Sequence, residues 1–166
     1  MDSSLARLRV VPDCNILLQA AAHREGPSGR CFDLARSIHF DLFASRTMFQ
    51  KFRATASKPA VRTHLPSLTP LRIRQFVVLL ERRAQFVRRV ARTAPIVRDA
   101  KDQIYLDLAA AVGADFLITR DHDLLDLMTQ HTIAAKEFRS RSRPLRIVTP
   151  VGFLRDVERR GYLPSS

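Results

Sequence analysis

The sequence predicts an α/β fold in which helices cover both faces of a central parallel sheet. Short apolar segments rich in β-branched residues alternate with longer segments that have helical periodicity. The short segments are apolar at nearly every position, as strands are when both faces of a parallel sheet are buried. We therefore expect a chain of 166 residues to form a single domain over 1–166.

The first elements follow from apolar patterns and turn residues. Leu8–Val11 is predicted as a strand, and Ile16–Ala22 as the helix that follows it. Ser28 is expected to cap a helix that extends to Arg36. A second strand over His39–Ser45 and a helix over Arg46–Ala56 come next.

Capping residues mark the later elements. Thr69 and Pro70 form a cap and first-turn pair, which predicts a helix to about Arg83. A further helix over Asp99–Val112 ends at Gly113, where a left-handed C-cap residue is needed. The remaining expectations are a strand over Phe116–Thr119, a strand at Ile147 and Val148, a helix from Thr149 to Arg160, and loops over Lys58–Ser67 and Arg139–Arg143.

Charge points to a polyanionic partner. The net charge is +12 and the isoelectric point is about 11.2, and a strongly basic domain gains affinity for nucleic acid by releasing condensed counterions. Residues 42–80 contain no acid, whereas seven of the sixteen acids fall between Asp99 and Asp126. We expect RNA contacts from the acid-free stretch, at Arg46, Lys51, Arg53, Lys58 and Arg62.

Targeting signals are not evident in the chain. It contains only two cysteines and lacks a secretory segment or an apolar run of membrane-spanning length, so a cytoplasmic location is expected and no membrane association.

Three aspartates are expected to converge on one edge of the sheet. Asp13 and Asp121 each follow a predicted strand, and Asp102 lies in the first turn of the helix before the Phe116 strand. Carboxylates without a histidine or thiolate partner suit Mg²⁺ or Mn²⁺, which favour phosphodiester hydrolysis. Asn15 is expected to support Asp13 by hydrogen bonding and Thr119 to support Asp121, while Asp41 and Asp107 are assigned to structure.

Four segments together resemble bacterial PIN domains, and in particular the VapC-type toxins of toxin–antitoxin pairs. They are DCNILLQA, RDAKDQIYLDLA, ADFLITRDHDLL and RIVTPVGFL, and the resemblance covers about residues 8–156. It implies a three-layer α/β/α fold, a Mg²⁺ or Mn²⁺ site and endoribonuclease activity. It also implies RNA and a small antitoxin protein as partners, and a homodimer.

The resemblance also assigns the site. Asp13, Asp102 and Asp121 match the family's catalytic and metal-binding acids, and Asp123 matches an additional acid of this branch. One position departs from the pattern: the family's Glu, six residues beyond a Ser, corresponds to Lys51 when counted from Ser45. A lysine there opposes metal binding, because an ammonium competes with a cation for the same carboxylates.

Lys51 and the positive charge leave a second function open, a non-catalytic PIN-like module that binds RNA. A phosphatase that uses Asp121 and Asp123 as a nucleophile pair is disfavoured, because that motif belongs on a first strand and here it follows a late one.

Overall fold

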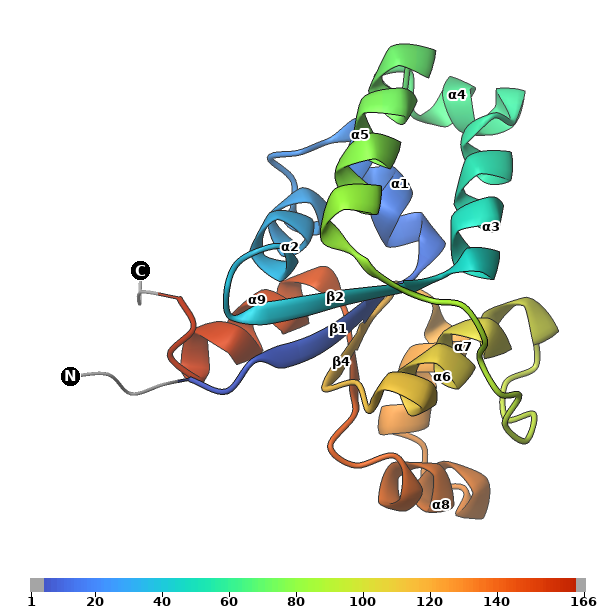
Figure 1. Cartoon of the computed structure of the whole chain (residues 1–166). Helices are drawn as coiled ribbons and strands as arrows, with labels where there is room; N and C mark the ends of the chain where they lie inside the picture. Colours follow the sequence, from blue (N-terminus) through green and yellow to red (C-terminus); the bar gives the residue numbers. More distant parts are fainter. Residues whose placement is uncertain (1–4, 164–166) are drawn as a thin grey trace.

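A computed structural model describes residues 5–163 of the chain and contains one sheet of five parallel strands (Figure 1). The strand order is β3-β2-β1-β4-β5. The strands are β1 (Leu8–Pro12), β2 (Phe40–Ser45), β3 (Gln85–Val87), β4 (Phe116–Ile118) and β5 (Arg146–Val148). The predicted α/β class with a parallel sheet is therefore confirmed.

Helices cover both sides of the sheet. The longer ones are α1 (Cys14–Ala22), α2 (Pro27–Ala35), α3 (Arg46–Ala56), α5 (Pro70–Arg83), α6 (Ala100–Val112), α8 (Ile133–Arg141) and α9 (Pro150–Arg159). The shorter ones are α4 (Pro59–His64), α7 (His122–Leu125) and the 3₁₀ turn η1 (Asp126–Met128). In Figure 1, α1, α2 and α5 lie on one side of the sheet and α6, α7 and α8 on the other.

The core forms where these layers meet. Val10, Val11 and Leu117 on the central strands are fully buried, as a parallel sheet covered on both faces requires. Phe153 of α9 stacks edge-on against Phe116 and lies 5.9 Å from the Phe40 ring, so it joins α9 to both β4 and β2. No helix of residues 5–163 is long and apolar enough to cross a membrane.

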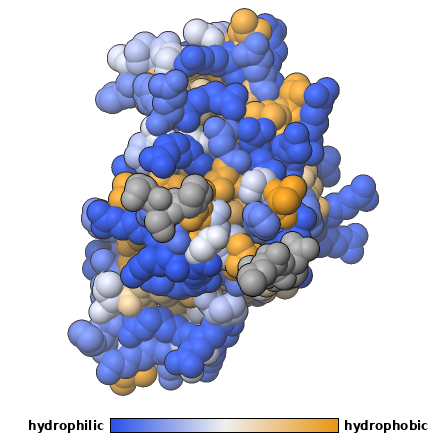
Figure 2. Space-filling model, turned by 90° about the vertical axis from the view of Figure 1, so that its left-hand side faces the viewer, coloured by the Kyte–Doolittle hydropathy of each residue, from blue (hydrophilic) through white to orange (hydrophobic). Residues whose placement is uncertain are grey.

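The surface beside the starts of the strands is mainly hydrophilic. Figure 2 shows this side, on which apolar residues form small patches separated by polar ones. On the opposite side, where the strands end, β1 leads into α1, β2 into α3, and β4 into α7. In an open parallel sheet, sites form at this edge, beyond the carboxyl ends of the strands.

Several local predictions were wrong. Ser28 does not cap α2, because Gly26 is the N-cap and the Ser28 hydroxyl instead donates to Gln19 Oε1 at 2.8 Å. The segment Lys58–Ser67 was predicted as a loop but contains α4. The loop predicted over Arg139–Arg143 is helical in its first part, because α8 extends to Arg141. Strand β3 was not anticipated, because its three residues are largely exposed and lack an apolar pattern.

Candidate metal centre

The register of the sheet places Asp13 beside Thr119. Pro12 pairs with Ile118 in the parallel ladder of β1 and β4, so the next residue of each strand leaves the sheet at the same point. The backbone N–H of Asp13 continues the ladder by donating to Ile118 O at 3.0 Å. Asp13 is 4% exposed and Thr119 is fully buried, so the two residues form the buried part of the site.

The carboxylate of Asp13 is held by two hydrogen bonds. Its Oδ1 accepts from the backbone N–H of Ile16 at 2.9 Å, which makes Asp13 the N-cap of α1, and its Oδ2 accepts from the Thr119 hydroxyl. Burial raises the pKa of Asp13, and so does the charge of Asp121, while the bonds from Thr119 and Ile16 oppose the increase. Asp13 is thus a buried carboxylate that faces further negative charge.

The Thr119 hydroxyl joins Asp13 to the loop after β4. Besides donating to Asp13, its Oγ1 accepts from the backbone N–H of Asp121 at 2.9 Å. Thr119 was predicted to support Asp121, and it does so through the Asp121 backbone while its proton goes to Asp13. Asn15 is exposed, and its effect on Asp13 comes from its backbone N–H.

Three further carboxylates converge near Asp13. Oxygens of Asp102, Asp121 and Asp123 all lie within 4.8 Å of one another, the only such group of acids, histidines or cysteines in residues 5–163. Asp121 caps the short helix α7, with its Oδ1 accepting from the Asp123 N–H at 2.8 Å. The cap is therefore Asp121 and not Asp123, which leaves the Asp123 carboxylate exposed beside the other two.

Asp102 reaches this cluster from the first turn of α6, where Asp99 is the N-cap. Burial and the charges of Asp121 and Asp99 raise the pKa of Asp102 to about 6, and Lys51 opposes that shift. Burial is the largest cause of this raised pKa, and the rest comes from neighbouring negative charge, which a divalent cation would relieve. An all-oxygen donor set of this kind fits Mg²⁺ or Mn²⁺.

Lys51 lies close enough to the cluster for its charge to act on Asp102. Its Nζ donates to Lys101 O at 3.3 Å and sits 5.1 Å from the centre of the Tyr105 ring. Tyr105 lies one turn beyond Asp102 on α6, and its hydroxyl accepts from the backbone N–H of Cys14 at 3.2 Å. Tyr105 had no signal in the sequence beyond this helical spacing from Asp102.

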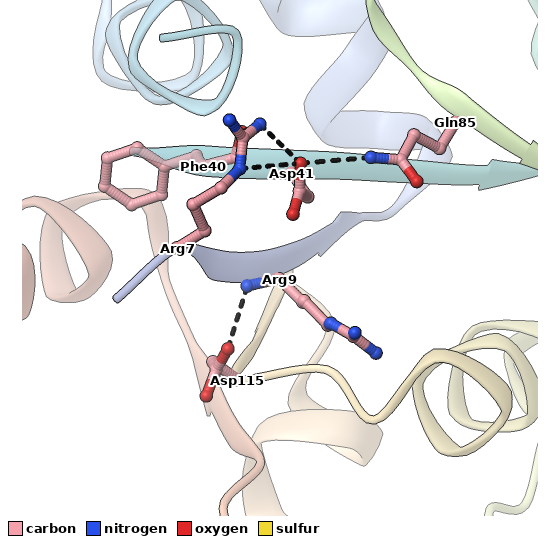
Figure 3. A network of polar contacts seen from close by, with 6 residues as sticks. All are labelled: Arg7, Arg9, Phe40, Asp41, Gln85 and Asp115. Atoms are coloured by element: carbon pink, nitrogen blue, oxygen red, sulfur yellow. Dashed lines mark hydrogen bonds and ion pairs between the residues drawn. The ribbon is translucent and has the colours of Figure 1, made fainter. Parts of the chain in front are cut away.

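Two other aspartates have structural partners. Asp41 accepts from Arg7 Nη2 at 2.5 Å and from Gln85 Nε2 at 3.0 Å, which ties the starts of the strands together (Figure 3). Asp107 Oδ1 accepts from Thr93 N at 3.0 Å and from Gln103 Nε2 at 3.0 Å. Both were assigned to structure, and both are bonded away from the cluster.

The residues expected to contact RNA lie on α3 and the segment after it. Arg46, Arg53, Lys58 and Arg62 are exposed and Lys51 is half-buried. Sequence reasoning missed a second basic segment, residues 82–98, which contains six arginines and no acid. Its signal was present in the sequence, but only the structure places it beside α3, through the pairing of β3 with β2.

Comparison with known proteins agrees with this geometry. A search of curated proteins found no match. A family model described as PIN domain matches residues 9–123, which is more than half of the chain. The matched range includes Asp13, Asp102, Asp121 and Asp123, together with the strands and helix that position them. The chain therefore belongs to the PIN domain family.

Proposed function

We propose that this protein is a Mg²⁺- or Mn²⁺-dependent endoribonuclease. PIN domains are typically metal-dependent nucleases. The observation that carries the proposal is the convergence of Asp102, Asp121 and Asp123 within 4.8 Å beside the buried Asp13. We expect Asp13, Asp102 and Asp121 to be catalytic. Asp102, Asp121 and Asp123 are the expected direct ligands of the cation, and Asp13, which lies outside that group of three, is expected to help hold it through its charge.

The four acids would act on the cation in two ways, according to where they lie. Asp102, Asp121 and Asp123 would offer their carboxylate oxygens to the cation as ligands. Asp13, which is held by hydrogen bonds from Thr119 and Ile16, would add negative charge from the buried part of the site. A bound divalent cation supplies positive charge that polarises a phosphoryl oxygen and activates water. The chain would contribute the carboxylates that hold the cation, so that its positive charge can act on a phosphodiester.

Two measurements test the activity. Calorimetry should show Mn²⁺ binding to the wild-type protein, and the affinity should fall at least tenfold in Asp121→Asn and in Asp102→Asn. Cleavage of a circular single-stranded RNA should require the cation, because only an endonuclease cuts a substrate without ends. Asp126→Asn is the matched control, since it removes an acid of the same segment that lies outside the cluster. A wild-type protein that neither binds Mn²⁺ nor cuts the circle contradicts the proposal.

We further propose that the protein acts as the toxin of a type II toxin–antitoxin pair and is held by a small antitoxin protein. The sequence resemblance to VapC-type toxins supports this role. Induced expression in a bacterial host should arrest growth, and Asp121→Asn should relieve the arrest at equal protein level. Growth arrest by both forms would separate toxicity from the nuclease site.

One observation favours a second function, a PIN-like RNA-binding module without catalysis. Lys51 stands where the family has Glu, and its charge acts on Asp102. RNA binding without cleavage at any Mn²⁺ concentration would support this alternative.

A further inference from the structure

A groove runs along the edge of the sheet formed by β3. A hollow of about 730 Å³ is lined by residues that include Phe49 and Phe86. A second hollow of about 410 Å³ includes Ser45, Arg92 and Ile104. Both hollows are also lined by Arg46, Val87, Arg88 and Arg89, so they form one continuous depression, here called the edge groove.

An aromatic ring is presented in this groove. Phe86 is 39% exposed, although it is a large apolar residue on a strand. Its ring meets the Phe49 ring at 5.6 Å with an interplanar angle of 89°, so Phe49 holds it in place from α3. A fixed and exposed aromatic ring is what a nucleobase needs for stacking.

The groove is strongly basic. Arg46, Arg88, Arg89 and Arg92 line it and are exposed, whereas Glu81 is the exposed acid among the lining residues. The other acid, Asp107, is 7% exposed and accepts hydrogen bonds from the Thr93 N–H and hydroxyl. Its charge is therefore directed into the protein, and the arginines dominate the surface.

The same hydrogen bonds connect the groove to the metal centre. Asp107 and Gln103, both on α6, bind Thr93, and Gln103 Oε1 also accepts from the Ile96 N–H at 3.1 Å. These contacts fasten the arginine-rich segment to α6, the helix that also carries Asp102. Ile104 of that helix lines the second hollow, so the edge groove borders α6.

We propose that the edge groove binds single-stranded RNA, with one base stacked on Phe86 and the neighbouring phosphates contacted by Arg46, Arg88 and Arg89. This inference rests on the proposed ribonuclease function and names the subsite that holds the substrate strand outside the metal centre. Arginines that track a backbone beside an exposed aromatic ring favour a single strand, because the bases of a duplex are already stacked on one another.

A fluorescent variant tests the stacking directly. The chain contains no tryptophan, so Phe86→Trp introduces a single indole at the proposed subsite. Addition of a short oligouridylate in EDTA should quench and shift its emission, whereas a duplex of the same length should do so much less. Ile133→Trp is the matched control, because Ile133 is exposed on α8 and is not part of the groove. Its emission should not change.

Binding measurements test the contribution to affinity. By fluorescence anisotropy in EDTA, Phe86→Ala should weaken binding of the same oligonucleotide by roughly 5- to 150-fold, the range for loss of one stacked base. The double variant Arg88→Ala, Arg89→Ala should also weaken it, and both variants should bind Mn²⁺ as the wild type does. Arg155→Ala is the charge control and should bind normally, because Arg155 is exposed on α9, which contacts β4 and β5 at the opposite edge of the sheet from β3.

The outcomes separate this inference from the proposed function. If the wild type cleaves RNA but Phe86→Ala binds RNA unchanged and the Phe86→Trp emission does not respond, the edge groove is not the subsite, and a protein segment becomes its better occupant. If the wild type binds Mn²⁺ but neither binds nor cuts RNA, the proposed function fails together with its substrate. Quenching by RNA with loss of affinity in Phe86→Ala supports the subsite whether or not the protein cuts.

Discussion

The ammonium of Lys51 lies 5.1 Å from the centre of the Tyr105 ring, across the gap between α3 and α6. That ring also anchors the residue after Asp13, because its hydroxyl accepts from the Cys14 N–H. One contact thus joins Lys51 to both the helix of Asp102 and the exit of β1. The position of Lys51 makes its charge part of the site electrostatics.

Lys51→Glu should tighten Mn²⁺ binding by about tenfold or more and raise ribonuclease activity, because it removes a competing cation and adds an oxygen ligand. The Mn²⁺ affinity of Lys51→Ala, measured by calorimetry, should lie between those of the wild type and Lys51→Glu, since the change removes a charge without supplying a ligand. Lys58→Glu makes the same charge change at the N-cap of α4 and should leave metal affinity unchanged. Weaker RNA binding with unaltered metal affinity in Lys51→Glu would place Lys51 among the phosphate contacts instead.

Thr119→Val should weaken Mn²⁺ binding by roughly 10- to 100-fold, the usual effect of removing a group that orients a ligand. It should also destabilise the protein by about 1–3 kcal/mol, because Asp13 loses its donor and the Asp121 N–H loses its acceptor while the side-chain volume is kept. Thr119→Ser retains the hydroxyl and should recover most of the metal affinity. Urea unfolding and calorimetry on both variants decide the matter.

Asp13→Asn should leave the stability of the metal-free protein level or slightly higher. Burial and the Asp121 charge make the ionised Asp13 costly, and Asn caps a helix as well as Asp does. Mn²⁺ affinity should fall at the same time, which separates the metal role from the folding role. Stability is measured by urea unfolding in EDTA at pH 7. A large loss of stability would mean that the carboxylate itself is needed for α1 to form.

The raised pKa of Asp102 predicts a pH dependence. The folded protein keeps this proton up to about pH 6, whereas the unfolded chain loses it near the ordinary value of 3.8. The folded state therefore binds more protons in that window, so the contribution of Asp102 to stability falls as pH rises from about 4 to about 6. Mn²⁺ affinity should rise over the same window, because protons compete with the cation.

Two variants identify the group responsible. Asp102→Asn should remove this part of the pH dependence from unfolding curves recorded in EDTA. Asp99→Asn should shift it to lower pH, because one of the charges that raise the pKa of Asp102 is lost while the cap of α6 is retained. An unshifted profile in both variants would assign the transition to another carboxylate.

RNA affinity should decrease steeply with salt. Each phosphate neutralised on a single strand contributes a slope of about 0.7 in a plot of log affinity against log salt concentration. Arg53→Ala and Arg62→Ala should each reduce the slope by up to this amount, since both residues are exposed in the acid-free stretch. A flat profile for the wild type would exclude phosphate contacts as the source of affinity.

The sequence alone determined the strands that carry the site and the acids at their ends. Apolar runs that stop at Asp13 and before Asp121 are local patterns, and the polar residue that ends each run is visible without a structure. The helix that starts at Asp99 was equally predictable, because its cap, its first-turn acid and its C-terminal Gly113 are all local signals. Membership of the PIN family followed from the same segments.

Only the tertiary structure decided which groups hold these acids. The donor to Asp13 is Thr119, 106 residues away, and it was expected to serve Asp121 alone. The pairing of β3 with β2 places Phe86 and Arg88 beside α3, although β3 is too short and too exposed to have an apolar pattern. Such contacts depend on strand register and helix packing between distant segments, and neither is encoded in the periodicity of any one segment.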